Sequence, residues 1–128
     1  MLKLGIAMEY TDVLVFDEET LLGHLFNLKK VNYIEIEKYE KYGEKRLTFI
    51  EDNDREAIKG LSYEEKKKRN HLLIMRGALF EIAEALNYKL NLVIGFLAEL
   101  HLKNENYKIK CYQEGKIYFM RNGRKYNE

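Results

Sequence analysis

Three carboxylates have a spacing that could support chemistry. Asp17 closes a predicted strand, and Glu35 and Glu37 alternate on the next one. Because alternate residues of a strand point to one face, these oxygens could hold Mg²⁺ and position an attacking water, as in metal-dependent nucleases. Such sites usually carry a lysine two places after the last acid, but position 39 is Tyr39. A solvated strand face explains this Glu- and Lys-rich segment better, so the nuclease is the third of three hypotheses.

Histidine and cysteine add no catalytic or metal-ligating pattern. His24, His71 and His101 are dispersed without ligand spacing, and Cys111 is the only cysteine. The chain has no CxxC, no glycine-rich phosphate loop and no nucleophile-base pattern that spacing could support. We therefore predict no catalytic residue, no metal site and no cofactor.

Length and composition predict a globular protein. At 128 residues and 46% hydrophobic content, the chain can build one ordinary domain or two very small ones. Eighteen consecutive apolar residues occur nowhere, and Glu9 interrupts the first segment, so we expect neither a membrane span nor a signal peptide. A cytoplasmic protein is the resulting expectation. No internal repeat is evident.

Charge is unevenly distributed, although the formal net charge is +1. Residues 1–60 carry 9 Lys/Arg against 13 Asp/Glu, whereas residues 61–128 carry 13 against 8. The basic half is where a polyanion would bind. Solvated helix and strand faces explain so modest an imbalance about equally well.

The first 57 residues predict a small acidic α/β unit. Short aliphatic and β-branched runs at 3–9 and 12–17 are typical of strands. Residues 17–30 place acids first, an apolar stripe next and two lysines last, which predicts a helix. Residues 31–52 predict a hairpin that turns near Gly43. Dimerisation is one role that this unit could have.

The second half predicts three helices and a terminal hairpin. Ser62, followed three residues later by Glu65, forms a capping box that opens the first helix. A GALF link precedes the second helix, and Glu114 and Gly115 make a good two-residue turn for the hairpin. The expected elements are helices at 63–76, 80–87 and 91–103 and strands at 108–113 and 116–121.

Residues 81–100, EIAEALNYKLNLVIGFLAEL, fill the positions that a helix-turn-helix requires. Ala83 is small where the helices would touch, and Asn87 tolerates the positive φ of the turn. The other suitable positions are Ile82, Leu86, Tyr88, Val93 and Phe96. With the hairpin as a wing, residues 60–126 resemble the winged helix-turn-helix superfamily, although a plain amphipathic helix pair would also supply the apolar residues. The predicted fold is thus α+β, an α/β unit at 1–57 followed by a winged helix-turn-helix at 60–126.

The resemblance implies binding to double-stranded DNA, as in a small transcription regulator that acts as a homodimer. Lys89 and Asn91 of the second motif helix would approach the groove. The wing would contact phosphates through its basic residues, which are Lys108, Lys110, Lys116, Arg121, Arg124 and Lys125.

The second motif helix departs from the pattern of a base reader. Its outward positions include Leu90, Ile94 and Ala98, whereas base edges call for polar side chains. An exposed apolar patch usually marks a protein contact. The second hypothesis is therefore a protein-interaction module, or a subunit of a larger assembly, that docks a protein partner on these three residues.

Overall fold

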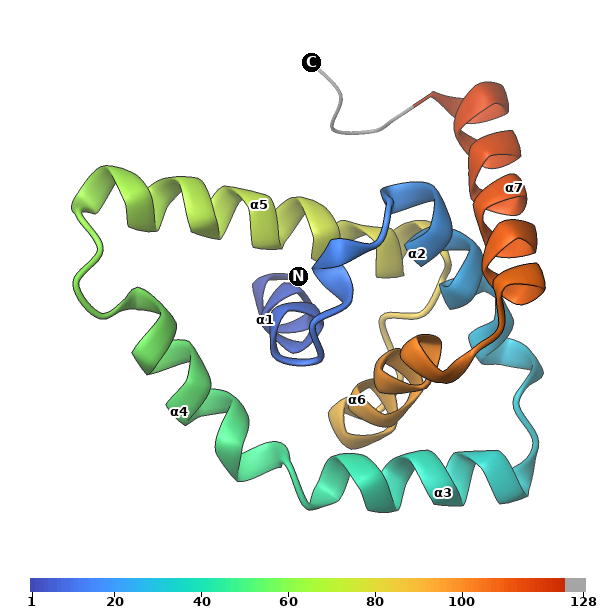
Figure 1. The fold of residues 1–128 in the computed structure, drawn as a ribbon, viewed down its shortest axis with the longest axis horizontal. Coiled ribbons are helices and arrows are strands. Elements are labelled where there is room, and N and C mark those ends of the chain that lie inside the picture. The colour runs from blue at the N-terminus through green and yellow to red at the C-terminus, as the bar shows by residue number, and fades with distance from the viewer. Residues whose placement is uncertain (124–128) are drawn as a thin grey trace.

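The computed structural model describes residues 1–123 of the chain, and the ordered elements within them are helices (Figure 1). Short 3-10 turns occur in the segments that follow three of these helices. The α-helices are α1 (Leu2–Tyr10), α2 (Glu18–Phe26), α3 (Tyr33–Glu44), α4 (Leu47–Ile58), α5 (Tyr63–Ile82), α6 (Leu90–Glu99) and α7 (Glu105–Asn122).

The predicted α+β fold is wrong, because no residue from 1 to 123 lies in a strand. The first two predicted strands form α1 and a 3-10 turn, and the first predicted hairpin forms α3 and part of α4. The expected wing lies inside α7, and the expected link at Gly77 lies inside α5. Asn87 does not have the positive φ predicted for the turn, since Glu84 has it instead. A fold with a hairpin wing is therefore excluded.

Helix starts follow from local capping. The Ser62 side chain accepts the N–H of Glu65 at 3.2 Å, and the Glu65 carboxylate accepts the N–H of Ser62 at 2.9 Å, which confirms the predicted capping box. Asn32 and Glu35 form the same reciprocal pair at the start of α3. Asn104 accepts the N–H of Tyr107 at 2.9 Å where α7 begins. The predicted helix at 17–30 is also confirmed, as α2 and the 3-10 turn after it.

Antiparallel helix pairs form the framework, and they join the two halves of the chain: α1 with α5, α2 with α7 and α3 with α6. Each helix places one glycine at the point of closest approach. In the first pair, a Cβ on Gly5 would overlap the backbone of Leu73, and a Cβ on Gly77 would overlap that of Met1. The helices therefore cross backbone against backbone.

The other two pairs have the same geometry. In each of them, the glycine of one helix contacts the backbone four residues before the glycine of its partner. The contacts are Gly23 with Cys111 and Gly115 with Glu19 between α2 and α7, and Gly43 with Asn91 and Gly95 with Tyr39 between α3 and α6.

These contacts reveal an internal repeat that the sequence analysis missed. The glycines recur from 5 to 77, from 23 to 95 and from 43 to 115, a spacing of 72 residues each time. The same spacing separates Asp12 (φ 58°) from Glu84 (φ 57°), the only non-glycine residues of 1–123 with positive φ. It also separates the helix caps Asn32 and Asn104. The chain thus contains one three-helix unit twice.

The two units are related by an approximate twofold axis. Helix α1 packs on its own counterpart in α5, while α2 and α3 of the first unit pack on the counterparts of α3 and α2 in the second. This is the reciprocal pattern of an isologous dimer, here within one chain. His24 and Phe96 occupy equivalent positions, and their rings stack with centroids 4.0 Å apart and planes 6° apart. Helix α4 and the first half of α5 connect the units (Figure 1).

We predict that Gly95→Ala lowers the free energy of unfolding by about 1–3 kcal/mol, because the new Cβ would overlap the Tyr39 backbone. Helix propensity alone predicts the opposite sign, a gain of about 0.5–1 kcal/mol. Urea unfolding of both proteins measures the difference. The control is Gln113→Ala on the exposed face of α7, which should change stability by less than about 0.5 kcal/mol. A Gly95→Ala protein more stable than wild type would contradict the backbone crossing.

Candidate functional site

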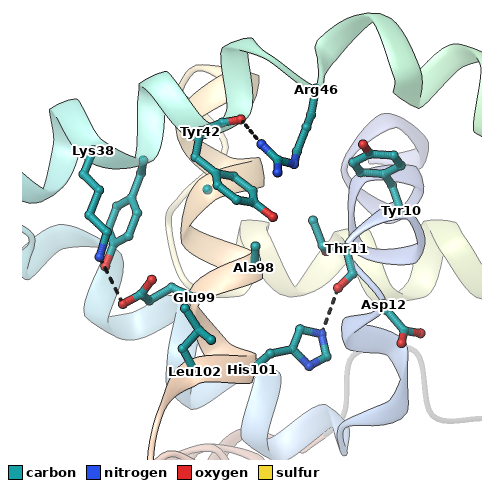
Figure 2. A pocket seen from close by; sticks show the side chains of 12 residues that line it. Tyr10, Thr11, Asp12, Lys38, Tyr42, Arg46, Ala98, Glu99, His101 and Leu102 are labelled. Carbon is teal, nitrogen blue, oxygen red and sulfur yellow. Dashed lines mark hydrogen bonds and ion pairs between the residues drawn. The ribbon is translucent and has the colours of Figure 1, made fainter.

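A cavity of about 540 Å³ opens where the end of α1, the second half of α3 and the end of α6 meet (Figure 2). Its floor is α6, where Gly95 and Ala98 are both small. We call this cavity the Ala98 pocket. It lies beside the closest approach of α3 and α6, because Gly95 also contacts the Tyr39 backbone.

Two cations lie on the α3 wall of the Ala98 pocket, and they differ in the groups that they contact. Lys38 forms an ion pair with Glu99 across the pocket edge at 3.5 Å. Arg46, just beyond the end of α3, donates from Nη1 to the carbonyl of Tyr42 at 3.0 Å. Its guanidinium carbon also lies 3.6 Å from the centroid of the Tyr42 ring. Arg46 is therefore held by a last-turn carbonyl and a ring face, and it pairs with no carboxylate among residues 1–123.

The opposite wall is built by the turn after α1. Asp12 takes the left-handed conformation there, and the Thr11 hydroxyl donates to the carbonyl of Ala7 at 2.9 Å. His101 Nε2 lies 2.8 Å from the carbonyl oxygen of Thr11, which can only accept, so Nε2 carries a proton. The imidazole is thereby oriented along the pocket edge (Figure 2).

The equivalent place in the other unit is filled by side chains. Phe26 stands where the first site has Ala98, and Tyr118 stands where it has Arg46. The rings of Phe26 and Tyr118 lie 6.0 Å apart, with only a shallower hollow of about 310 Å³ beside them. We call this place the Phe26 site. Other equivalent positions also differ, such as Tyr39 and Cys111, but the exchange of alanine for phenylalanine is the one that removes a ring from the α6 side of the pocket.

The chemistry of the Ala98 pocket suits binding. Burial raises the pKa of Tyr39 to about 12, and the charges of Glu99 and Glu35 add to the effect, so its phenol is neutral at physiological pH. Within residues 1–123, the hydrogen bonds of the pocket hold Arg46 and His101 to backbone carbonyls and do not pair a nucleophile with a base. The pocket offers aromatic faces, hydrogen-bond donors and a fixed guanidinium.

A buried polar network lies near the pseudo-twofold axis. His24 Nε2 donates to the carbonyl of Phe96 at 2.8 Å, so Nδ1 is the acceptor for the Tyr107 hydroxyl at 2.7 Å. The Tyr107 oxygen accepts in turn from Asn27 Nδ2 at 3.2 Å. His24 is fully buried, and its desolvation lowers its pKa to about 4. The imidazole is therefore neutral and serves packing, not metal binding or catalysis.

This burial predicts a pH-dependent stability. Because the folded pKa of His24 is near 4 and the unfolded value is near 6.5, the unfolded chain binds a proton between these values that the folded chain does not. Stability should fall as pH drops from 6.5 toward 4, by up to about 3 kcal/mol. Urea unfolding between pH 7 and pH 5, above most carboxylate titration, measures this slope. His24→Gln should be less stable at pH 7 but show a flatter profile, and parallel profiles would contradict the assignment.

The residues predicted to contact DNA from the second motif helix do not face outward together. Lys89 is exposed at the N-cap position of α6, whereas Asn91 is half-buried and accepts the N–H of Leu92 at 2.8 Å. The residues predicted to contact a protein partner are also separated. Ile94 is fully buried in the core, Leu90 is partly buried, and Ala98 lines the pocket. Helix α3 packs on the apolar face of α6 for which the sequence predicts a protein partner.

The residues predicted to form a basic wing lie on α7. Lys110, Lys116 and Arg121 are exposed there. Lys108 is half-buried, pairs with Glu105 at 3.7 Å and lies 5.5 Å from the centroid of the Phe16 ring. Arg124 and Lys125 lie outside the described residues.

The three acids of the nuclease hypothesis lie at the starts of helices or within a helix. Asp17 occupies the N-cap position of α2, Glu35 belongs to the capping box of α3, and Glu37 pairs with Lys41 at 3.1 Å. Between residues 1 and 123, no group of three or more His, Cys, Asp or Glu residues is placed to hold a metal ion.

Most residues of the Ala98 pocket were not anticipated from the sequence. Lys38, Tyr42 and Arg46 are spaced by four, which on a helix places them along one face, but the alternating pattern of the same segment predicts a hairpin. Tyr10 and His101 come from the ends of other helices, and the sequence contains no signal that brings them together.

Comparison with known proteins identifies no relative. No protein-family model matches the chain, and neither does any curated protein or solved structure. Over residues 1–123, no helix is both long and apolar enough to cross a membrane. Function therefore has to be inferred from the pocket and the internal repeat.

Proposed function

We propose that the protein binds a small organic molecule in the Ala98 pocket and does so without catalysis. The observation that carries this proposal is the contrast between two equivalent places in one chain. The ring of Phe26 fills the Phe26 site, whereas the small side chain of Ala98 leaves the Ala98 pocket open.

The size and lining of the pocket support a small-molecule ligand. A volume of about 540 Å³ falls within the range of about 300–1,000 Å³ that is typical of such sites. Apolar surface from Tyr10, Tyr42 and Leu102 surrounds a small number of placed polar groups. An aromatic side chain at position 98 could cover this surface, as Phe26 does in the other unit, and would add stability through burial. Alanine forgoes that gain and leaves room for a ligand.

The test uses N-phenyl-1-naphthylamine, an uncharged aromatic dye that fluoresces in apolar sites. Wild type should enhance its fluorescence, and Ala98→Phe should reduce the enhancement at least about tenfold, because the new ring takes the dye's place. Ala98→Phe should unfold at the same or a higher urea concentration than wild type, since the equivalent pair of α2 and α7 holds a phenylalanine at this position.

Phe26→Ala provides the matched control. It makes the same exchange in the opposite direction at the equivalent position, and it should keep the dye binding of the Ala98 pocket. If Ala98→Phe bound the dye as well as wild type does, the proposed function would be wrong.

DNA binding and transcription regulation stay predictions. Lys110, Lys116 and Arg121 are exposed on α7, and none of them forms an ion pair with another residue of 1–123. They offer phosphate contacts but no base reader, because Asn91 is engaged with the backbone. The homodimer, the protein partner and the cytoplasmic location stay predictions as well.

A further inference from the structure

We infer that the ligand of the Ala98 pocket has a planar aromatic body and one acidic group, and that Arg46 binds the acidic group. This inference rests on the proposed function and adds the chemical class of the ligand. It follows from the charges of the pocket, the fixed position of Arg46 and the content of the Phe26 site.

Charge pairing singles out Arg46. Lys38 already has a carboxylate partner, because its Nζ lies 3.5 Å from Glu99 Oε1. Arg46 forms no ion pair with another residue of 1–123, and the one hydrogen bond of its side chain within these residues, from Nη1 to the Tyr42 carbonyl, uses a single N–H. A guanidinium has five N–H donors in a planar fork. Most of its donors therefore remain available to a ligand.

Arg46 is also fixed in place before any ligand arrives. Its guanidinium lies against the Tyr42 ring, with 3.6 Å between the guanidinium carbon and the ring centroid. The hydrogen bond to the Tyr42 carbonyl anchors it a second time. A stacked, anchored fork matches a carboxylate or phosphate with little loss of side-chain entropy on binding.

The opposite wall sets the direction of the ligand. Asp12 lies beside His101 at that wall, away from Arg46 (Figure 2). A carboxylate next to Asp12 would be repelled, whereas next to Arg46 it would be attracted. The acidic group therefore lies at the Arg46 end, and the body of the ligand extends over Ala98 toward His101.

The Phe26 site indicates which kind of group fits the space above Ala98. There, an aromatic ring from α2 packs against Tyr118, in the space equivalent to that above Ala98. In the open pocket, the side chains of Tyr10 and Tyr42 line this space (Figure 2). Aromatic rings attract one another beyond the burial of their area, so a planar ring fits this space best.

Three indoles that share one body and differ in charge test the inference: indole-3-acetate, the neutral alcohol tryptophol and the cation tryptamine. Each is titrated against the protein loaded with N-phenyl-1-naphthylamine. On the wild-type protein, indole-3-acetate should displace the dye at a concentration at least about tenfold lower than tryptophol does. The reason is that charge-assisted hydrogen bonds to the carboxylate replace neutral ones to the alcohol. Tryptamine should be the weakest.

Arg46→Gln is the diagnostic variant. It should lose the preference for indole-3-acetate over tryptophol, which is a ratio of two displacement concentrations measured on the same protein with the same dye. Lys41→Gln is the matched control, because it removes the same charge from α3 at a residue that does not line the pocket, and it should keep the preference.

The outcomes separate this inference from the proposed function. Equal displacement by all three indoles, with dye binding still lost in Ala98→Phe, would overturn the ligand class and leave the proposed function standing. Retention of the preference in Arg46→Gln would overturn the assignment of Arg46. Failure of all three indoles to displace the dye would overturn the aromatic body, whereas dye binding that Ala98→Phe does not affect would remove both proposals.

Discussion

Direct contact between helix backbones is the constraint on which this structure depends. At the crossing of α1 and α5, Gly5 and Gly77 leave no room for a Cβ, and the other two helix pairs repeat the arrangement. So close an approach sets the position of each pair along both helices, because only one register brings both glycines to the crossing. Most of the core follows from this register, including the stacking of His24 on Phe96 beside the pseudo-twofold axis.

The same constraint explains how a duplicated unit can produce one open pocket. The crossings hold both halves in equivalent positions, so a side chain can change beside a crossing without altering the framework. Gly95 and Gly23 are equivalent crossing residues, and Ala98 and Phe26 follow them at the same distance along α6 and α2. The backbone thus provides two sites, and side chains determine that one is filled and the other is open.

Local signals in the sequence were sufficient for some elements and misleading for others. The capping box of Ser62 and Glu65 and the acid-to-base order of 17–30 depend on neighbours in the chain, and both were predicted correctly. The local sequence predicts turns or links at the glycines of 43, 77 and 115, whereas tertiary contact places these glycines inside helices. In α7 the spacing of four through Tyr107, Cys111, Gly115 and Phe119 is a helical signal, but it competed with an alternating pattern that is typical of strands. The pocket could not be predicted, because it requires the pairing of α3 with α6.

The central claim is that the ligand binds at Ala98 and not at the equivalent Phe26. Backbone amide NMR of the ¹⁵N-labelled protein, titrated with N-phenyl-1-naphthylamine, compares the two sites within one molecule. The account predicts chemical-shift changes at Gly95 and Ala98, with Gly23 and Phe26 nearly unchanged. Equal changes at both sites, or none at Gly95 and Ala98, would contradict it.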